Sequence, residues 1–406
     1  MRSETIEVQG HIIDSLILPR VLDEILSHEG TFEILDVDIG QRRQDPSRAR
    51  IRVMAPDDEH LESILTAVRT HGAEVPGEGD VQLAPAPCDG VFPEGFYVTT
   101  NYPARIRCQG RWIEVEHPRM DCGLRVDPEA GRAETAKFGQ VRAGDCFVIG
   151  GRGVHVMPPA RGRERNVFEF MSSDVSSEKP KRAIIREIAG QMRQARAEGK
   201  KILLVGGPAI VHTGAVPAVV ALIEAGYVDR LFAGNALAVH DIEYALLGTS
   251  LGVSLENALA SEEGHEHHIR AINAIRRAGG IRQAVESGLL RSGIMHACIR
   301  HGVEMVLAGS IRDDGPLPEV ITDTLAAQKR MLALTDNTGV ALMVATALHS
   351  IATGNLLPVT TRIVCVDINQ AVITKLADRG SFQTVGLVTD VGLFFEELLT
   401  HLREPQ

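Results

Sequence analysis

The chain has 406 residues, 44% of them hydrophobic and 23% charged, which allows two or three domains with cores of their own. A formal net charge of −11, the lack of a long basic block and an aromatic content of 4% argue against nucleic acid as a partner. The sequence shows neither a membrane span of about 18 apolar residues nor an apolar signal core, so we expect a cytoplasmic protein.

Residues 1–86 are predicted to form a small α/β unit. Amphipathic helices are expected at residues 17–26 and 58–71, where apolar side chains recur at three- and four-residue spacing. The expected strands are residues 5–12, 31–39, 49–54 and 81–83. The resulting order, β-α-β-β-α-β, is that of a ferredoxin-like unit, which predicts a topology and no chemistry.

Residues 87–175 are predicted to form a small β-rich domain, because they combine many Gly and Pro residues with short β-like runs. The expected strands are residues 95–100, 104–108, 111–116, 123–126, 146–149 and 154–157. Two dense polar stretches, residues 88–95 (CDGVFPEG) and 117–123 (HPRMDCG), interrupt them and are called the polar loops below. Their composition is typical of functional loops, although the same side chains could serve only to tie the loops together.

Residues 176–406 are predicted to form a doubly wound, Rossmann-like α/β domain with a parallel sheet, after a polar connector at residues 173–183. The expected strands are residues 202–205, 230–233, 305–308, 363–366 and 385–388. The expected helices are residues 184–197, 215–225, 236–247, 266–290, 319–334, 340–353, 370–379 and 392–402.

The stretch KILLVGGPAIVHTGA, residues 201–215, combines a buried strand, a glycine turn and the start of a helix. Such a connection can cradle a phosphate, because free N–H groups and the helix dipole favour an anion there. The stretch is not a G-x-G-x-x-G fingerprint, and Pro208 offers no N–H. An ordinary strand-to-helix connection explains the same residues equally well.

Small or polar residues follow all five predicted strands of this domain, at the edge where open parallel sheets bind ligands. Their recurrence predicts a nucleotide site. The second strand ends in Asn235 where an acidic residue is expected, so Asp367 is the better candidate for a ribose contact, or equally a helix cap. The candidate cofactor-binding residues are Gly207, Pro208, Ala209, His212, Thr213, Gly234, Asn235, His240, Asp241, Ser310, Arg312, Asn337, Thr338, Gly339, Asp367, Ile368, Asn369 and Asp390.

No metal site is expected. The six cysteines form no C-x-x-C pair and lie beside no His at metal-ligand spacing, which also argues against a disulfide framework. The run GHEHH at residues 264–268 lacks the second half of a metal site, so we interpret it as a polar loop or helix start.

Six long motifs resemble the archaeal-type ornithine cyclodeaminases, a family with the so-called LOR/SDH conserved region. The motifs are CDGVFPEGFYVTTNYP (88–103), VEHPRMDC (115–122), GGPAIVHTGA (206–215), LFAGNALAVHDIEYALLGTSLG (231–252), AGSIRDDGPLPEV (308–320) and ALHSIATGNLLP (347–358). The chain is also similar to the C-terminal part of cyanobacterial bifunctional arginine dihydrolase/ornithine cyclodeaminases. The resemblance does not extend to an arginine dihydrolase domain, so that second activity is not implied.

The resemblance implies that L-ornithine is converted to L-proline and ammonia with a tightly bound, internally recycled NAD. It also implies a C-terminal domain similar to the NAD-binding fold of deoxyhypusine synthase. Such chemistry needs a closed site, a carboxylate for the amine and an Arg for the substrate carboxylate. We expect Asp89 or Glu94 to contact the amine, Arg119 to bind the carboxylate, and Asn101, Asp121 and Cys122 to lie around them. Arg312, Asp313 and Asp314 are rival substrate contacts.

Three other functions compete with this one. An NAD-dependent amino-acid dehydrogenase would release an oxo acid, and a non-catalytic NAD-binding regulator would turn over no ω-amino acid. A deoxyhypusine-synthase-like transferase needs a lysine that traps an imine, and Lys329 and Lys375 fall on predicted helices instead. In each case we expect a homo-oligomer.

Overall fold

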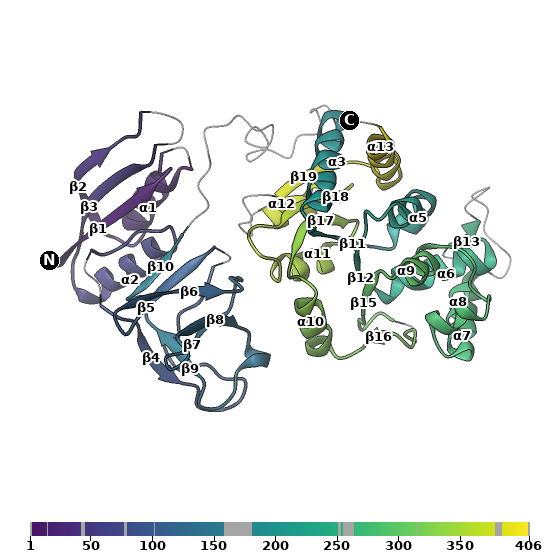
Figure 1. Cartoon of the computed structure of the whole chain (residues 1–406), viewed down its shortest axis with the longest axis horizontal. Coiled ribbons are helices and arrows are strands. Elements are labelled where there is room, and N and C mark those ends of the chain that lie inside the picture. The colour runs from purple at the N-terminus through teal and green to yellow at the C-terminus, as the bar shows by residue number, and fades with distance from the viewer. Residues whose placement is uncertain are drawn as a thin grey trace. The chain divides into compact units, whose positions relative to one another are not determined.

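The computed structural model describes residues 2–13, 15–41, 45–76, 79–100, 102–157, 181–250, 253–254, 264–313, 315–377 and 384–404. By its internal contacts the chain divides into two compact units, residues 1–167 (the first unit) and 168–406 (the second unit) (Figure 1). The first unit contains both segments that the sequence separates at residue 86, and each segment has its own sheet and apolar core.

The first sheet of the first unit consists of β1 (Arg2–Gly10), β2 (Thr31–Asp38) and β3 (Ser47–Ala55), paired antiparallel in the order β1-β3-β2. Helices α1 (Ile17–Ser27) and α2 (Asp58–Arg69) complete its apolar core. Side chains of β3 alternate between buried and exposed, as expected for a strand with one face on a core. The predictions for these elements are confirmed to within a few residues.

The last strand of the predicted ferredoxin-like order joins a different sheet. Strand β4 (Gln82–Pro85) pairs with β9. On the edge of β1, the described residues form an isolated β-bridge between Glu7 and Glu74 instead of a strand. A fourth strand would occupy that edge in a complete unit of this kind. Strand β4 therefore connects the α/β segment directly to the β-rich segment.

The second sheet of the first unit has the order β10-β5-β6-β8-β7-β9-β4 among the described residues. Its strands besides β4 are β5 (Ala104–Cys108), β6 (Arg111–Glu116), β7 (Gly123–Asp127), β8 (Arg132–Ala136), β9 (Cys146–Ile149) and β10 (Val154–Val156), with a 3-10 turn η1 at Phe138–Gln140. The strand predicted at residues 95–100 forms only isolated bridges, at Phe96 and Val98. Strand β8 was not predicted, because its residues RAETA include a single β-branched side chain.

The second unit contains a parallel sheet, which has the order β16-β15-β12-β11-β17-β18-β19 in the described ranges. The strands are β11 (Lys201–Gly206), β12 (Arg230–Gly234), β15 (Glu304–Ala308), β16 (Val320–Ile321), β17 (Thr338–Val344), β18 (Arg362–Asp367) and β19 (Thr384–Val388), and a small hairpin pairs β13 (Thr249–Ser250) with β14 (Val253–Ser254). The helices are α3 (Lys181–Ala197), α4 (Ala209–His212), α5 (Val216–Glu224), α6 (Asn235–Leu247), α7 (Gly264–Ala278), α8 (Ile281–Glu286), α9 (Ile294–His301), α10 (Thr324–Ala333), α11 (Ala347–Gly354), α12 (Gln370–Ala377) and α13 (Val391–Arg403).

The predicted helix at residues 340–353 is wrong over its first half. Residues 338–344 form strand β17, which pairs with β11 and β18 and is buried at every position. A short, continuous apolar run fits a buried helix as well as a strand covered on both faces, so periodicity alone could not decide. The helix begins only at Ala347, as α11.

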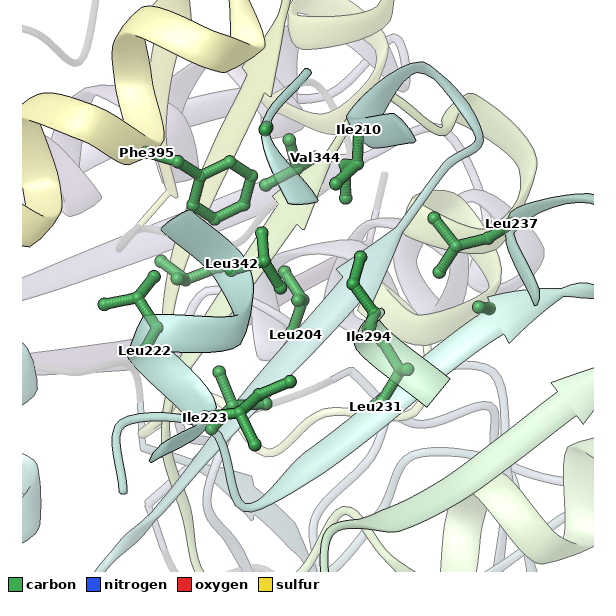
Figure 2. Close-up of a cluster of buried hydrophobic side chains, with 14 of the residues drawn as sticks. Leu204, Ile210, Leu222, Ile223, Leu231, Leu237, Ile294, Leu342, Val344 and Phe395 are labelled. Atoms are coloured by element: carbon green, nitrogen blue, oxygen red, sulfur yellow. The ribbon is translucent and has the colours of Figure 1, made fainter. Parts of the chain in front are cut away.

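Apolar side chains fill both faces of this sheet. On one face, side chains of β11, β12 and β17 pack against α5, α6, α9 and α13, and Figure 2 shows Leu204, Leu342 and Phe395 in that layer. On the other face, Leu203, Val205 and neighbouring strand residues pack against α10 and α12. The chain leaves β11 toward α5 on the first face and leaves β17 toward α11 on the second. The sheet therefore has its topological switch point between β11 and β17, where ligands bind in folds of this class.

The helices of the described ranges include none that is both long and apolar enough to cross a lipid bilayer.

Candidate active site

Gly207 stands at the switch point, directly after β11. Its N–H donates to the carbonyl oxygen of Val344 at 2.9 Å, and a Cβ on Gly207 would overlap the carbonyl oxygen of Ala345. Ala345 itself has a φ of +53°, in the left-handed region that non-glycine residues rarely adopt. Backbone strain of this kind is concentrated at functional sites. The glycine is therefore required because the ends of β11 and β17 are in direct contact.

Two helices begin without a side-chain cap on either side of Gly207. Helix α6 follows Gly234 at the end of β12, and α11 follows Thr346 after β17. The first turn of an uncapped helix has N–H groups without intrahelical partners, and together with the helix dipole they attract an anion. The two starts are close together, since a Cβ on Gly234 would lie 3.2 Å from Cε1 of His349 in α11. His349 was not among the predicted site residues.

Large apolar side chains are exposed along the same edge of the sheet. Ile311, Leu348, Ile368 and Leu393 are 107%, 71%, 77% and 59% exposed, and each follows a different strand. Exposed apolar groups beside polar ones often mark a ligand site. The half-buried Asp367 lies among them, and one of its oxygens accepts the N–H of Asn369 at 2.8 Å. This edge thus combines N–H donors, a carboxylate and apolar side chains.

A series of polar side chains extends from this edge into the interior of the second unit. Nδ1 of His212 lies 2.7 Å from the hydroxyl of Ser250, and its ring centre lies 5.0 Å from that of His240. Nδ1 of His240 lies 3.1 Å from a carboxylate oxygen of the fully buried Glu243, whose other oxygen accepts the hydroxyl of Thr249 at 3.0 Å. Burial lowers the pKa of His212 below its ordinary value, and the neighbouring His240 lowers it further, against the opposite effect of Glu243.

Asp241, a predicted cofactor residue, caps a buried helix. Its two carboxylate oxygens accept the N–H groups of Ile294 and Met295, each at 2.7 Å, at the start of α9. Its side chain is completely buried, and burial raises its pKa to about 7 although both N–H groups act in the opposite direction. Asp241 therefore holds α9 against α6, and the structure does not place its carboxylate at the sheet edge.

We expect Asp241 to make thermal stability depend on pH. Because its folded pKa of about 7 lies above the ordinary 3.8, the folded state holds the proton more tightly than the unfolded state. The contribution of Asp241 to the free energy of unfolding is complete below about pH 4 and is lost as the pH rises through about 7. Each unit of difference between the folded and unfolded pKa is worth about 1.4 kcal/mol. Melting temperatures measured from pH 5 to 8 should therefore fall more steeply for the wild type than for Asp241→Asn. Parallel curves would contradict this assignment.

The remaining cofactor candidates fall into two groups. Residues 337–339 lie at the amino end of β17, the opposite edge of the sheet, where Asn337 Nδ2 donates to the carbonyl oxygen of Gly199. The rest lie at the carboxyl edge, and several of their side chains bond within their own turns. Asp390 caps α13, and Thr213, Ser310 and Asn369 make similar local bonds. Asn235 instead accepts the N–H of Leu317, which is distant in the sequence.

Thr99, which follows the first polar loop, is hydrogen-bonded to the second polar loop at residues 117–123. Its hydroxyl donates to the carbonyl oxygen of Arg119 at 2.6 Å and accepts the N–H of Cys122 at 3.1 Å. His117 and Asp121 both have left-handed backbones, with φ of 51° and 58°. These bonds hold the loop in one strained conformation. Thr99 was not among the predicted site residues although it lies in the motif at residues 88–103, because only its buried contacts distinguish it from its neighbours there.

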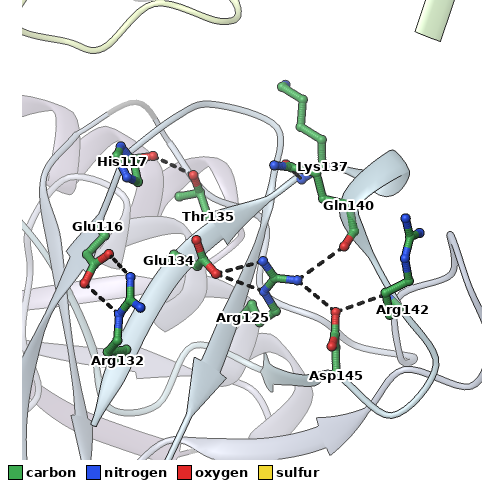
Figure 3. Close-up of polar contacts among 10 residues, drawn as sticks. All are labelled: Glu116, His117, Arg125, Arg132, Glu134, Thr135, Lys137, Gln140, Arg142 and Asp145. Carbon is green, nitrogen blue, oxygen red and sulfur yellow. Dashed lines mark hydrogen bonds and ion pairs between the residues drawn. The ribbon is translucent and has the colours of Figure 1, made fainter. Parts of the chain in front are cut away.

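The other polar loop is attached to an arginine network, drawn in Figure 3. Arg125 Nη1 donates to the carboxylate of Asp145 at 3.0 Å, and Asp145 in turn accepts the N–H of Arg142 at 3.0 Å. The next residue, Ala143, donates its N–H to Asp89 at 2.9 Å. Asp89 therefore has one oxygen bound to a fixed turn, and its side chain is exposed.

The predicted catalytic residues differ in burial. Arg119 and Cys122 are buried, with 7% and 1% exposure, and burial raises the pKa of Cys122, which favours the neutral thiol. Asp89, Glu94 and Asp121 are exposed. The predictions at Asn101 and Asp314 lie outside the described residues. Among the residues that the structure describes, there is no cluster of His, Cys, Asp and Glu side chains that could hold a metal ion.

The chain matches three family descriptions in succession. Residues 3–102 match the LOR/SDH bifunctional enzyme conserved region. Residues 103–185 match the first region of the C-terminal part of ArgZ-like arginine dihydrolases, and residues 186–398 match the Rossmann fold of that C-terminal part.

Similar proteins cover almost all of the chain. An ornithine cyclodeaminase from Methanocaldococcus jannaschii is 53% identical over 98% of this chain and 96% of its own length. The apo crystal structure of ArgZ, an arginine dihydrolase from the ornithine–ammonia cycle in cyanobacteria, is 38% identical, with a TM-score of 0.87 over 99% of this chain and 58% of ArgZ. The ternary complex of AgrE with ornithine and NAD+ is 40% identical, with a TM-score of 0.54 over 99% of this chain and 57% of AgrE. The chain thus spans somewhat more than half of each cyanobacterial protein.

Proposed function

This chain belongs to the ornithine cyclodeaminase family, and we infer from that membership that it converts L-ornithine into L-proline and ammonia with the help of NAD. The observation that carries this inference is the 53% identity to an archaeal ornithine cyclodeaminase over nearly the full length of both chains. The AgrE relative, whose structure holds ornithine together with NAD+, supports the same substrate and cofactor.

The carboxyl edge of the parallel sheet fits NAD. The uncapped starts of α6 and α11 beside Gly207 offer N–H groups to the pyrophosphate. The carboxylate of Asp367 can accept ribose hydroxyls, and exposed apolar side chains such as Ile368 can cover the rings. When bound, NAD would accept a hydride from Cα of ornithine and return it to the cyclic imine. Since the cofactor is regenerated in each turnover, the reaction needs no second redox partner.

We propose that the polar loops of the first unit bind ornithine. The guanidinium of Arg119 would bind the substrate carboxylate with two parallel hydrogen bonds, a geometry that Lys cannot reproduce. Asp89 or Glu94 would hold the amine and accept its proton, with Asn101, Asp121 and Cys122 around them. Thr99 positions this loop and touches no substrate in this scheme. Arg312 and Asp313, on the turn after β15, are the rival contacts.

One assay tests the proposed function. Purified protein is incubated with L-ornithine alone, proline and ammonia are measured, and the cofactor released by denaturation is identified. We expect equal amounts of proline and ammonia, no net NADH, and NAD in the denatured extract. NADH that accumulates in proportion to product would identify an amino-acid dehydrogenase instead. Bound NAD without turnover of any ω-amino acid would identify an NAD-binding regulator.

Two further properties stay predictions from the sequence. These are the homo-oligomeric state, which light scattering would measure, and the cytoplasmic location.

A further inference from the structure

The proposed reaction requires proton transfers besides the two hydride transfers. The δ-ammonium of ornithine must lose a proton before its nitrogen lone pair can form a bond to the imine carbon. The attack leaves an extra proton on the new ring nitrogen. This proton must move to the former α-amine, so that the electron pair of the breaking Cα–N bond leaves with ammonia while the lone pair of the ring nitrogen forms the cyclic imine. One side chain that accepts the proton of the ring nitrogen and donates it to the departing amine would balance this exchange, and the proton lost before the attack is returned when the product amines become ammonium groups. An imidazole suits this role, because its ordinary pKa lies near neutral pH.

His212 has the geometry for such a role. It ends α4, the short helix directly after Gly207 and Pro208 at the switch point. Its Nδ1 is anchored to the hydroxyl of Ser250 at 2.7 Å, and Ser250 is buried and paired in the β13–β14 hairpin. Its Nε2 has no hydrogen-bond partner in the part of the chain that is described, and the ring is only half-buried. One nitrogen therefore fixes the ring, and the other stays available to a ligand.

Next to His212, a series of polar side chains continues into the interior of the second unit. Apolar side chains would be enough to fill this space, so the polar groups need another explanation. His240 and the fully buried Glu243 lie one turn apart on α6, 3.1 Å from each other. Glu243 also accepts the hydroxyl of Thr249, and this hydroxyl lies 2.7 Å from Nδ1 of His267 in α7. Burying a carboxylate in a core is costly unless charged or polar partners compensate. A negative charge at this depth stabilises an imidazolium at His212 while it holds the proton.

We propose that His212 is a further catalytic residue, which transfers the protons of the cyclisation and of ammonia release, while Asp89 or Glu94 holds the amine and takes the proton that it loses before the hydride transfer. In this scheme Ser250 fixes its ring, His240 and Glu243 set its charge state, and Thr249 holds the carboxylate of Glu243 in place. This inference rests on the proposed function and extends it, because the sequence predicts only a cofactor contact for His212. A residue that merely touches NAD would change cofactor binding, whereas a proton-transfer residue changes the rate and its pH dependence.

The first test compares His212→Asn with the wild type in the ornithine assay. We expect kcat to fall by about 100-fold or more, the usual contribution of a general acid–base, while the NAD content after denaturation stays at the wild-type level. His296→Asn is the matched control, because it replaces another imidazole whose pKa is lowered by burial, on α9. It should keep kcat within about twofold of the wild type, since general acid–base catalysis is lost only with the proton-transfer group itself.

Three outcomes separate the hypotheses. A wild type that forms no proline overturns the proposed function itself. A wild type that forms proline, together with unchanged kcat in His212→Asn, overturns only the role of His212. A loss of activity that matches a loss of bound NAD also overturns it, because His212 would then be a cofactor contact.

The second test does not depend on any His212 variant being well folded. Among the titratable groups of the elements packed against α4, those whose charge acts on His212 are His240 and Glu243. Glu243→Gln removes a charge that raises the pKa of His212, so the acidic limb of the kcat/KM profile should move to lower pH. His240→Asn removes a charge that lowers this pKa, so the limb should move to higher pH. Shifts in the same direction, or none, would contradict the proposal.

Discussion

Gly207→Ala is expected to lose bound NAD and to unfold at a lower temperature than the wild type. The added methyl group would overlap the carbonyl oxygen of Ala345, so the ends of β11 and β17 would have to separate. Forcing an extra carbon into a packed site costs about 1–3 kcal/mol, and here the displaced backbone also borders the expected pyrophosphate position. The NAD content after denaturation and the melting temperature measure the two effects.

Gly190→Ala is the matched control for this substitution. Gly190 lies inside α3, where a Cβ would meet no atom within 4 Å. Alanine is the better helix former by about 0.8–1 kcal/mol, so this variant should keep its NAD and melt no lower than the wild type. If Gly207→Ala also retained NAD and its melting temperature, the switch point would not be the cofactor site that we propose.

Arg119→Met is expected to reduce kcat/KM for ornithine by about 100-fold or more while NAD stays bound. Methionine keeps much of the buried stem but removes the guanidinium. Two charge-assisted hydrogen bonds to the substrate carboxylate are together worth about 3 kcal/mol or more. Arg119→Lys should recover only part of the loss, because an ammonium cannot form the paired hydrogen bonds. Steady-state kinetics and cofactor content after denaturation provide the measurements.

Arg132→Met serves as the control for Arg119→Met. Arg132 lies on β8 in the same sheet, is largely exposed and pairs only with Glu116 among the interactions described for it. Exposed pairs contribute about 0–1 kcal/mol, so activity should stay near the wild-type value.

Asp89→Asn and Glu94→Gln should each lower turnover with NAD still bound. Wild-type turnover in all three loop variants would remove the polar loops from the mechanism and favour Arg312 and Asp313.

Much of the fold could be predicted from local patterns. Helix α2 is amphipathic, and Asp57 caps its first turn, so its start is encoded within four residues. The buried run at residues 202–205 with Gly206 and Gly207 likewise indicated a strand, a turn and a position in a parallel sheet. Such signals are short in range and do not depend on what packs against them. The polar ends of the strands could be predicted for the same reason, because parallel strands present their carboxyl ends at one edge.

Strand β17 shows where local pattern failed. Residues 338–344 are apolar on both faces because they lie between β11 and β18 in the middle of the sheet, with helices on either side. A run of seven apolar residues does not indicate whether its N–H and C=O groups will bond within a helix or to neighbouring strands. The misplaced helix also carried residues 337–339 into the predicted cofactor site, although they lie at the opposite edge of the sheet.

The family, the parallel α/β sheet and the candidate edge of that sheet could all be predicted from the sequence, because motifs and hydrophobic periodicity are local properties of the chain. What the polar residues on that edge do became clear only from the packing of distant segments. Asp241 bonds to N–H groups more than 50 residues away at α9, and Thr99 holds a loop some 20 residues further along. His212 acquires its partner, Ser250, only when the hairpin after α6 folds back beside α4. A side chain's role depends on its neighbours in space, and burial and hydrogen bonding between distant segments arise only from packing.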